Sequence, residues 1–308
     1  MRILIAYDGS SGADAALFDL QRAGLPQEAE ALVISVADVW TFPPASDDSS
    51  EPRAKKLEII GLNKARLQAE QAIEAARETA TRASEAIKAK FPMWKVGAEA
   101  YGDSPAWAVI RRAEEWGANI IVGGTYGHSA LGRLFLGSMS QKVLYEARCS
   151  VRVARGQAGE DKSPVRILIG VDGSPSAQAA VSVVAARNWP PGSEARVVAV
   201  YSPFTLLATH YFVHPGSVAS RDYQDEGALA QKIVDAAAEK LCVAGITASP
   251  IVKEGDPKQV LVDEAKEWEA SCIFLGAKGA RGVERFLIGS VSASVAARAH
   301  CSVEVVRT

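Results

Sequence analysis

The chain has 308 residues, of which 48% are hydrophobic and 23% charged, and its formal net charge is −2. Such a composition is typical of a soluble globular protein of about two domains, and the near-neutral charge gives no reason to expect nucleic acid or anionic lipid as a partner. No apolar stretch is as long as a membrane span, and the short apolar start ending at Asp8 does not fit a signal peptide, so we expect a cytoplasmic protein.

The first half of the sequence alternates short apolar strands with amphipathic helices. Strands are expected at 2–7, 31–37, 94–101, 119–123 and 150–154, and helices at 11–23, 54–90, 105–117 and 138–147. Such alternation predicts an α/β domain with a parallel sheet covered by helices on both faces, as in flavodoxin-like or Rossmann-like doubly wound folds. The segment 54–90 could form an interaction coiled coil, but its apolar positions, including Leu67 and Ala80, make one stripe. We therefore expect this helix to cover the sheet.

The chain is a tandem duplication. Residues 2–10 recur as residues 166–174, an offset of 164, and from Pro105 onward the offset is 152. The first half therefore carries a net twelve extra residues between its first strand and Pro105.

The second half repeats the alternation of strands and helices. Strands are expected at 166–171, 195–201, 246–253, 271–276 and 302–307, and helices at 175–187, 226–243, 257–268 and 290–299. The long loop at 202–225 is expected to be a lid or a disordered excursion. We place one domain at 1–155, a polar and turn-rich linker at 156–164, and a second domain at 165–308.

A glycine motif occurs at equivalent places in the two halves. Its residues are Gly124, Gly127, Gly137 and Ser138 in the first half and Gly276, Gly279, Gly289 and Ser290 in the second. Glycine lets a bulky group approach the backbone, and the following helix start supplies unpaired amide donors, so the motif favours a phosphate site. A structural turn is the alternative, because Ser138 and Gln141 fit a capping box. The spacing of the glycines is the same in both copies, which favours a phosphate site over a purely structural turn.

Asp8 and Asp172 end the first strand of each half. This is the carboxyl edge of the sheet, where doubly wound folds bind their ligands. A carboxylate there can accept hydrogen bonds from ribose or adenine, or approach a magnesium ion bound to phosphates. The alternative is that Asp-Gly-Ser only makes the turn and caps the next helix.

Machinery for catalysis or for metal binding is not visible in the sequence. There is no Walker A motif, no GxGxxG after the first strand, and no CxxC among the four cysteines. His210 and His214 are four residues apart, but no third ligand is near them. No Ser/His/Asp or Cys/His set recurs in both halves, so we expect binding rather than catalysis.

Taken together, these motifs resemble the universal stress protein family in its tandem two-domain form. The resemblance rests on the strand ending in Asp-Gly-Ser, the Gly-x2-Gly-x9-Gly-Ser motif and the closing Cys-Ser-Val-x-Val strand, and it covers nearly the whole chain twice. It implies a five-stranded parallel sheet in the order 3-2-1-4-5 in each half. It also implies that the two halves pair as a pseudo-dimer through strands 150–154 and 302–307.

The resemblance further implies which residues meet a nucleotide. Asp8 and Asp172 would meet the adenosine, and Val36 and Val200 would offer backbone groups to the adenine. The glycines and serines of the motif would meet ribose and phosphates, and Met139 and Val291 would add helix-start amides.

We therefore expect a stress-response regulator that binds ATP. The sequence leaves open whether the ligand is ADP or AMP instead, and whether a magnesium ion is bound with it. The alternatives are a weak magnesium-dependent ATPase and a structural scaffold that binds no nucleotide. The sequence does not decide whether two such chains form a homodimer.

Overall fold

The computed structural model describes residues 1–39, 52–125, 136–156, 163–201, 220–279 and 288–307, with the backbone alone for 52–63 and 220–225. The first half contains β1 (Arg2–Ala6), α1 (Ser11–Asp19), the 3-10 turn η1 (Leu20–Arg22), β2 (Glu30–Ala37), α2 (Pro52–Lys90), β3 (Lys95–Gly102), α3 (Pro105–Trp116), β4 (Ile120–Gly124), α4 (Ser138–Glu146) and β5 (Ser150–Ala154). The second half contains β6 (Arg166–Gly170), α5 (Pro175–Ala185), β7 (Glu194–Tyr201), α7 (Ser220–Val243), β8 (Thr247–Glu254), α8 (Pro257–Glu267), β9 (Cys272–Gly276), α9 (Ser290–Arg298) and β10 (Ser302–Val306). Every predicted strand and helix is present.

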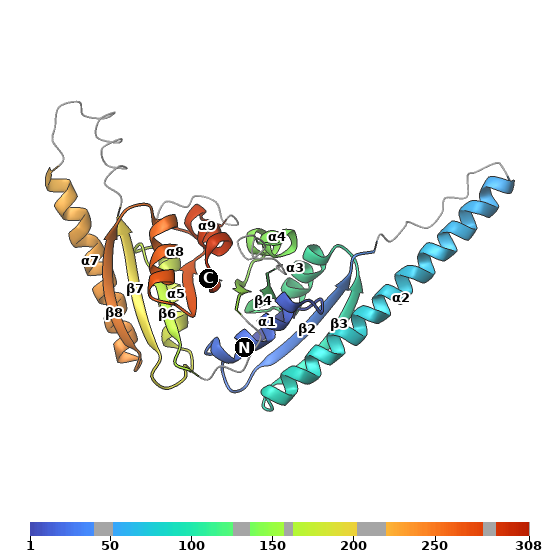
Figure 1. Ribbon diagram of the computed structural model, residues 1–308, viewed down its shortest axis with the longest axis horizontal. Coiled ribbons are helices and arrows are strands. Elements are labelled where there is room, and N and C mark those ends of the chain that lie inside the picture. The colour runs from blue at the N-terminus through green and yellow to red at the C-terminus, as the bar shows by residue number, and fades with distance from the viewer. Residues whose placement is uncertain (40–51, 126–135, 157–162, 202–219, 280–287, 308) are drawn as a thin grey trace, which may run out of the picture.

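The ten described strands form one sheet in the order β3-β2-β1-β4-β5-β10-β9-β6-β7-β8 (Figure 1). Within each half all neighbouring strands are parallel, and the order is 3-2-1-4-5. The halves join where β5 and β10 pair antiparallel, with Val153 opposite Val303. The expected fold class, strand order and pairing through the last strands are confirmed.

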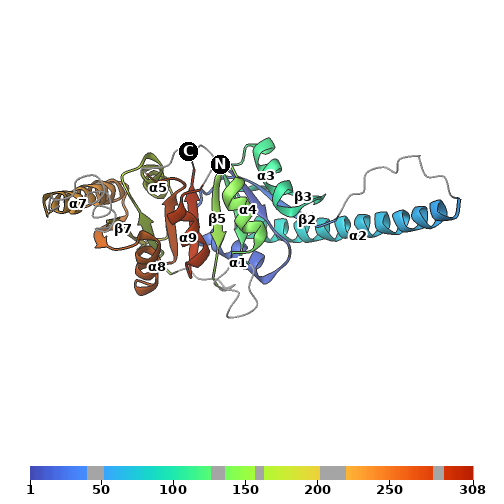
Figure 2. The same cartoon turned by 90° about the horizontal axis from the view of Figure 1, so that it is seen from above.

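Helices cover both faces of the sheet, as Figure 2 shows from above. Since side chains alternate along a strand, Ile3 and Ile5 are buried under α1 and α2, whereas Leu4 is buried under α3 and α4. The core under α3 and α4 continues across Val153 and Val303 to the core under α8 and α9. The two halves therefore share one hydrophobic core on this face.

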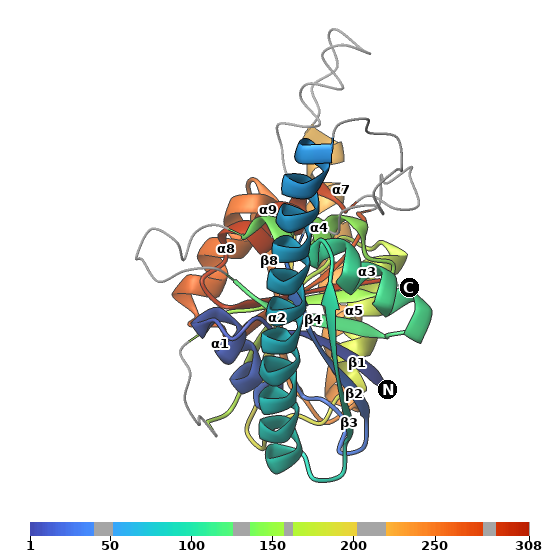
Figure 3. The same cartoon turned by 90° about the vertical axis from the view of Figure 1, so that its right-hand side faces the viewer.

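The long helix α2 covers the sheet only with its C-terminal part. Ala76, Ala80 and Ile87 are buried, but Leu67 is 56% exposed, and the N-terminal part of α2 projects beyond the sheet (Figure 3). The expectation that the whole apolar stripe covers the sheet is wrong for Leu67. A helix of 39 residues is roughly 58 Å long, whereas the eight-residue strands β2 and β3 span about 26 Å.

The expected loop at 202–225 is shorter than the sequence indicated, because α7 already begins at Ser220. The remaining residues, 202–219, lie outside the described ranges, as do His210 and His214 and most of the linker at 156–164. Among the helices that the structure describes, none combines the length and hydrophobicity needed to cross a membrane.

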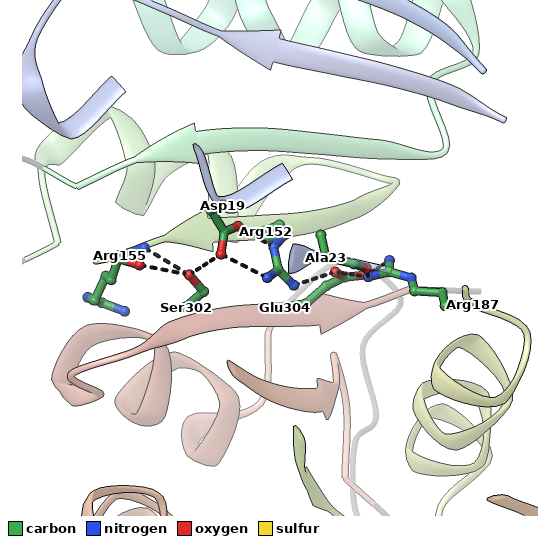
Figure 4. Close-up of polar contacts among 7 residues, drawn as sticks. All are labelled: Asp19, Ala23, Arg152, Arg155, Arg187, Ser302 and Glu304. Atoms are coloured by element: carbon green, nitrogen blue, oxygen red, sulfur yellow. Dashed lines mark hydrogen bonds and ion pairs between the residues drawn. The ribbon is translucent and has the colours of Figure 1, made fainter. Parts of the chain in front are cut away.

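A group of buried charges lies at the junction of the two halves (Figure 4). Arg152 on β5 contacts Asp19 on α1 (Nε to Oδ2, 2.5 Å) and Glu304 on β10 (Nη1 to Oε2, 3.2 Å), and Glu304 also pairs with Arg187. The side chains of Arg152 and Glu304 are each 1% exposed. Two positive and two negative groups compensate one another, which burial at this depth requires.

The buried charges select the pairing partner. Arg152 and Glu304 occupy equivalent positions of the duplication, at the offset of 152, and lie directly opposite each other in the β5–β10 ladder. If two copies of the first half paired in this register, two buried arginines would lie opposite each other. If two copies of the second half paired, two buried glutamates would lie opposite each other. Each arginine would keep Asp19 and each glutamate would keep Arg187, but like charges directly opposite each other in a ladder are destabilising, so this interface favours pairing of the first half with the second.

An ion pair links β3 to α3 in the first half. Glu99 accepts hydrogen bonds from Arg112, at 2.7 Å from Nε and 2.8 Å from Nη2, and the Arg112 guanidinium lowers the pKa of Glu99. In the second half Glu264 stands in the place of Arg112 and pairs with Arg196 and Lys253. The two halves thus keep an ion pair here with reversed charges.

The Glu99–Arg112 pair predicts a pH-dependent stability. We expect Arg112→Gln to lower the free energy of unfolding by about 1 kcal/mol at pH 7. Since the folded-state pKa of Glu99 lies below its ordinary value of 4.5, the pair stabilises the fold above that pH, and the contribution is lost as the pH falls through the lower folded-state value. Urea unfolding should therefore show a difference between variant and parent that shrinks from pH 7 to pH 3.

The control for this pH prediction is Arg66→Gln, since the Arg66 side chain is 80% exposed and its ion pair is with Glu70 on the same helix. We expect no measurable change in stability at either pH. A difference for Arg112→Gln that stays constant between pH 7 and pH 3 would contradict the assignment.

Candidate functional site

Each half has a cavity at the carboxyl ends of its strands. The first cavity measures about 460 Å³ and the second about 370 Å³. Of the residues expected to bind nucleotide, the first cavity is lined by Asp8, Val36, Gly124, Ser138 and Met139. The second is lined by Asp172, Val200, Gly276, Gly279, Gly289, Ser290 and Val291. Gly137 directly precedes Ser138, and Gly127 lies outside the described residues.

The Asp-Gly-Ser turn shapes one edge of each cavity. Gly9 and Gly173 have φ of 77° and 79°, a backbone conformation that favours glycine. Asp8 Oδ1 accepts the amide of Ser10 at 2.9 Å, and Asp172 Oδ1 accepts that of Ser174 at 3.0 Å. The turn alternative is therefore satisfied by one carboxylate oxygen of each aspartate. Both aspartates are nevertheless exposed at the cavity edge.

The serine of this turn caps the helix that follows it. Ser10 Oγ accepts the amide of Ala13, and Ser174 Oγ accepts that of Ala177, each at 3.2 Å. These bonds fix the starts of α1 and α5 beside the cavities. The aspartate and the serine thus have different structural roles: the carboxylate stabilises the turn, and the hydroxyl caps the helix.

The first glycine of each motif has a packing role. A Cβ on Gly124 would lie 2.0 Å from the carbonyl oxygen of Gly12, and one on Gly276 would lie 2.5 Å from the backbone carbon of Ser176. Only a residue without a side chain lets the strand end approach the helix start this closely. Glycine is therefore required at both positions by the packing of α1 and α5, whether or not a ligand is bound.

The helices that follow the glycine motifs begin without a side-chain cap. The N-cap residues are Gly137 for α4 and Gly289 for α9, and Ser138 and Ser290 are the first helical residues. The capping-box alternative for Ser138 is therefore wrong, because the helix begins one residue earlier than that motif needs. With glycine at the N-cap, no side chain there occupies the first amides of the helix, which remain suited to an anion.

A second serine in each helix, not predicted from the sequence, also supports the cavity. Ser140 Oγ donates to the carbonyl of Gly124 at 2.9 Å, and Ser292 Oγ donates to that of Gly276 at 2.7 Å. These bonds tie the helix start to the end of β4 or β9 and hold the cavity wall in place. The signal was present, since a serine stands two residues after Ser138 and after Ser290.

Few charged groups line the cavities within the described part of the chain. The first cavity is lined by Asp8, Asp38 and Lys142, and the second by Asp172 and Lys278. Burial, and then the hydrogen bond to Asp14, raise the pKa of Tyr7 at the first cavity to about 12, so its phenol stays protonated near neutral pH. Within the described ranges no three His, Cys, Asp or Glu side chains form a group that could hold a metal ion.

Comparison with known proteins agrees with the geometry. The sequence matches the model of the universal stress protein family over residues 1–155 and 165–307. A universal stress protein of Mycobacterium bovis is 26% identical over 310 aligned residues, which cover 99% of this chain and 96% of the relative. Another, of Mycolicibacterium smegmatis, is 31% identical over 196 residues, and the match spans 62% of each protein, less than two thirds of that relative.

A solved structure shows the same arrangement of the whole chain. The crystal structure of a universal stress protein from Archaeoglobus fulgidus superposes with a TM-score of 0.61 at 20% sequence identity, covering 99% of this chain and 96% of that one. At this identity the likeness concerns the fold. Because the family match extends over both halves, the chain belongs to the universal stress protein family and carries two consecutive domains of it.

Proposed function

We propose that this protein binds adenine nucleotides, with ATP as the first candidate, and acts as a cytoplasmic stress-response regulator by binding rather than by catalysis. The observation that carries the proposal is a cavity with two different ends. One end is the glycine-capped start of α4, and the other is the carboxylate of Asp8 beside the end of β2.

The start of α4 suits the phosphates of a nucleotide. Ser138 and Met139 line the first cavity, and their backbone amides belong to the first turn of the helix, where amides have no partner within the helix. The helix dipole adds partial positive charge at the same place. Lys142 lines the cavity one turn later and adds a full positive charge.

The opposite end suits the nucleoside. Ile34, Val36 and Val109 give the cavity an apolar wall, which fits the face of a purine ring. Asp8 stands at the mouth of this region, and a carboxylate is an acceptor for ribose hydroxyl groups. The order of apolar wall, carboxylate and helix start corresponds to the order of base, ribose and phosphate in the ligand.

The same cavity gives little support to an enzymatic role. Among the described residues that line the two cavities there is no cysteine or histidine, and Tyr7 has its pKa raised to about 12. These side chains therefore provide no nucleophile activated by a neighbouring histidine. Magnesium would enter with the phosphates, since a divalent ion in such sites is held by one or two carboxylates and by the ligand.

Ligand-induced stabilisation tests the proposal. We expect millimolar ATP with magnesium to raise the melting temperature of the purified chain by roughly 5 °C. In the double variant Asp8→Asn with Asp172→Asn we expect the apparent affinity to fall by about tenfold or more, because asparagine keeps an oxygen for the turn but loses the carboxylate. Isothermal titration calorimetry with ATP measures the affinities.

The control variant is Asp235→Ala, an exposed carboxylate on α7 away from both cavities, which should leave the nucleotide response unchanged. Absence of any response to ATP in the parent protein would favour the structural scaffold. Phosphate release that the double variant abolishes would favour the weak ATPase instead.

A further inference from the structure

Lys142 on α4 brings a positive charge to the first cavity. Among the described residues that line this cavity, it is the only cationic side chain. Ser138 and Met139 stand four and three residues before it, so all three share one face of the helix start. Long side chains on a helix point back toward its N-terminus. The Lys142 side chain therefore extends toward the first amides of α4, the proposed place of the phosphates.

The ring of Trp107 holds the end of the Lys142 side chain. Nζ of Lys142 lies 4.1 Å from the centroid of this ring, which makes a cation–π contact between α4 and α3. Trp107 directly follows Ala106, which lines the cavity, so the ring stands at the cavity rim. Within the described part of the chain Lys142 forms no ion pair and no hydrogen bond. The three N–H donors of its ammonium group are therefore available to an anion.

Core packing does not explain the position of Trp107. Its side chain is 46% exposed, so a large part of the stabilisation that burial of an aromatic ring provides is not gained. Its contact with Lys142 orders a side chain that is otherwise flexible. A ligand that binds an ammonium group already held in place loses less conformational entropy on binding.

The second half differs at both positions. The residues equivalent to Trp107 and Lys142, at the offset of 152, are Gln259 and Ser294. Ser294 does not line the second cavity. The lysine that lines it is Lys278, which stands between the first two glycines of the motif and not on α9. The lysine–tryptophan pair is therefore a feature of the first half.

We infer that Lys142 recognises the phosphates of the nucleotide in the first cavity, and that Trp107 is the residue that positions its ammonium group. This inference rests on the proposed nucleotide binding. Phosphate oxygens accept charge-assisted hydrogen bonds from an ammonium group, whereas a nucleoside without phosphate offers it no charged acceptor. The first cavity therefore distinguishes ATP from adenosine through this side chain.

Calorimetric titration of the full chain tests the role of Lys142. The variant Asp172→Asn, in which the second site is expected to be weakened, serves as the background so that the first cavity is observed. In this background we expect Lys142→Met to reduce the affinity for magnesium ATP by about tenfold and to leave the affinity for adenosine within about twofold. The control Lys232→Met removes an exposed lysine of α7 and should change neither affinity.

The positioning role of Trp107 is tested by two substitutions and their combination with Lys142→Met. Trp107→Leu should weaken ATP binding by about threefold, whereas Trp107→Phe, which keeps a ring face for the cation, should stay within about twofold of its background. In the Lys142→Met protein, Trp107→Leu should weaken ATP binding no further, because the ring acts through the ammonium group. An equal loss with and without Lys142 would show that the ring has only a structural role and would overturn its assignment.

The remaining outcomes separate the inference from the proposed function. An unchanged ATP affinity in Lys142→Met, or equal losses for ATP and adenosine, would overturn the role of Lys142 while nucleotide binding stands. Absence of ATP binding in the parent protein would overturn both. Circular dichroism shows whether Lys142→Met is folded. If it is not, Lys142→Gln, which also removes the charge, takes its place with the same expected results.

Discussion

Replacing Arg152 with leucine is expected to lower the free energy of unfolding by about 3–5 kcal/mol. The substitution removes one of two cations from a buried group and leaves Asp19 and Glu304 with exposures of 9% and 1%. Ser302 still donates to Asp19 at 2.6 Å and Arg187 still pairs with Glu304, but the group then carries an uncompensated negative charge inside the junction of the two halves. Urea unfolding followed by tryptophan fluorescence measures the loss.

Two further variants make the interpretation of Arg152 specific. Arg152→Lys keeps the charge but not the planar fork that reaches both carboxylates, so we expect an intermediate loss. Arg77→Leu removes an ion pair with Glu74 in which both side chains are more than 60% exposed, 64% and 63%, and should change stability by less than about 0.5 kcal/mol. A loss for Arg152→Leu no larger than that for Arg77→Leu would refute the role of the buried group.

Replacing Gly124 with alanine is expected to lower the free energy of unfolding by about 3 kcal/mol. The added Cβ would lie 2.0 Å from the carbonyl oxygen of Gly12 and 2.8 Å from the amide nitrogen of Ala13, and both are backbone atoms of the turn that starts α1. Backbone atoms cannot rotate away as a side chain can, so the start of α1 must shift. Because the turn of Asp8 and Ser10 leads directly into the start of α1, we expect nucleotide affinity to fall as well.

The neighbouring glycine gives a matched control for Gly124. Among the described residues, the Cβ added in Gly123→Ala meets only Ala6 Cβ, at 4.0 Å, so we expect stability to stay within about 1 kcal/mol of the parent, in the stabilising direction if it changes. Thermal unfolding of the two variants side by side measures the contrast. Equal losses at the two positions would show that any residue larger than glycine is rejected at this strand end, and the specific contact with Gly12 would not explain the requirement.

Much of the candidate site could be predicted because it depends on residues close in the sequence. Asp8 closely follows the buried strand β1 and Gly124 ends the buried strand β4, and parallel strands bring their carboxyl ends to one edge of a sheet. The residue spacing alone therefore placed both at one cavity. The start of α4 could not be fixed in this way, since serine and glycine are both good N-cap residues and only the backbone geometry shows that Gly137 takes the position.

The sequence by itself determined the duplication, the order of strands and helices, and the edge of the sheet where the cavities lie, because these follow from local periodicity and from a repeat. Only the tertiary structure decided that Arg152 faces Glu304 and that Gly124 packs against the backbone of Gly12. Such contacts depend on the register between strands far apart in the chain and on the space between side chains. Neither is encoded in the pattern of neighbouring residues.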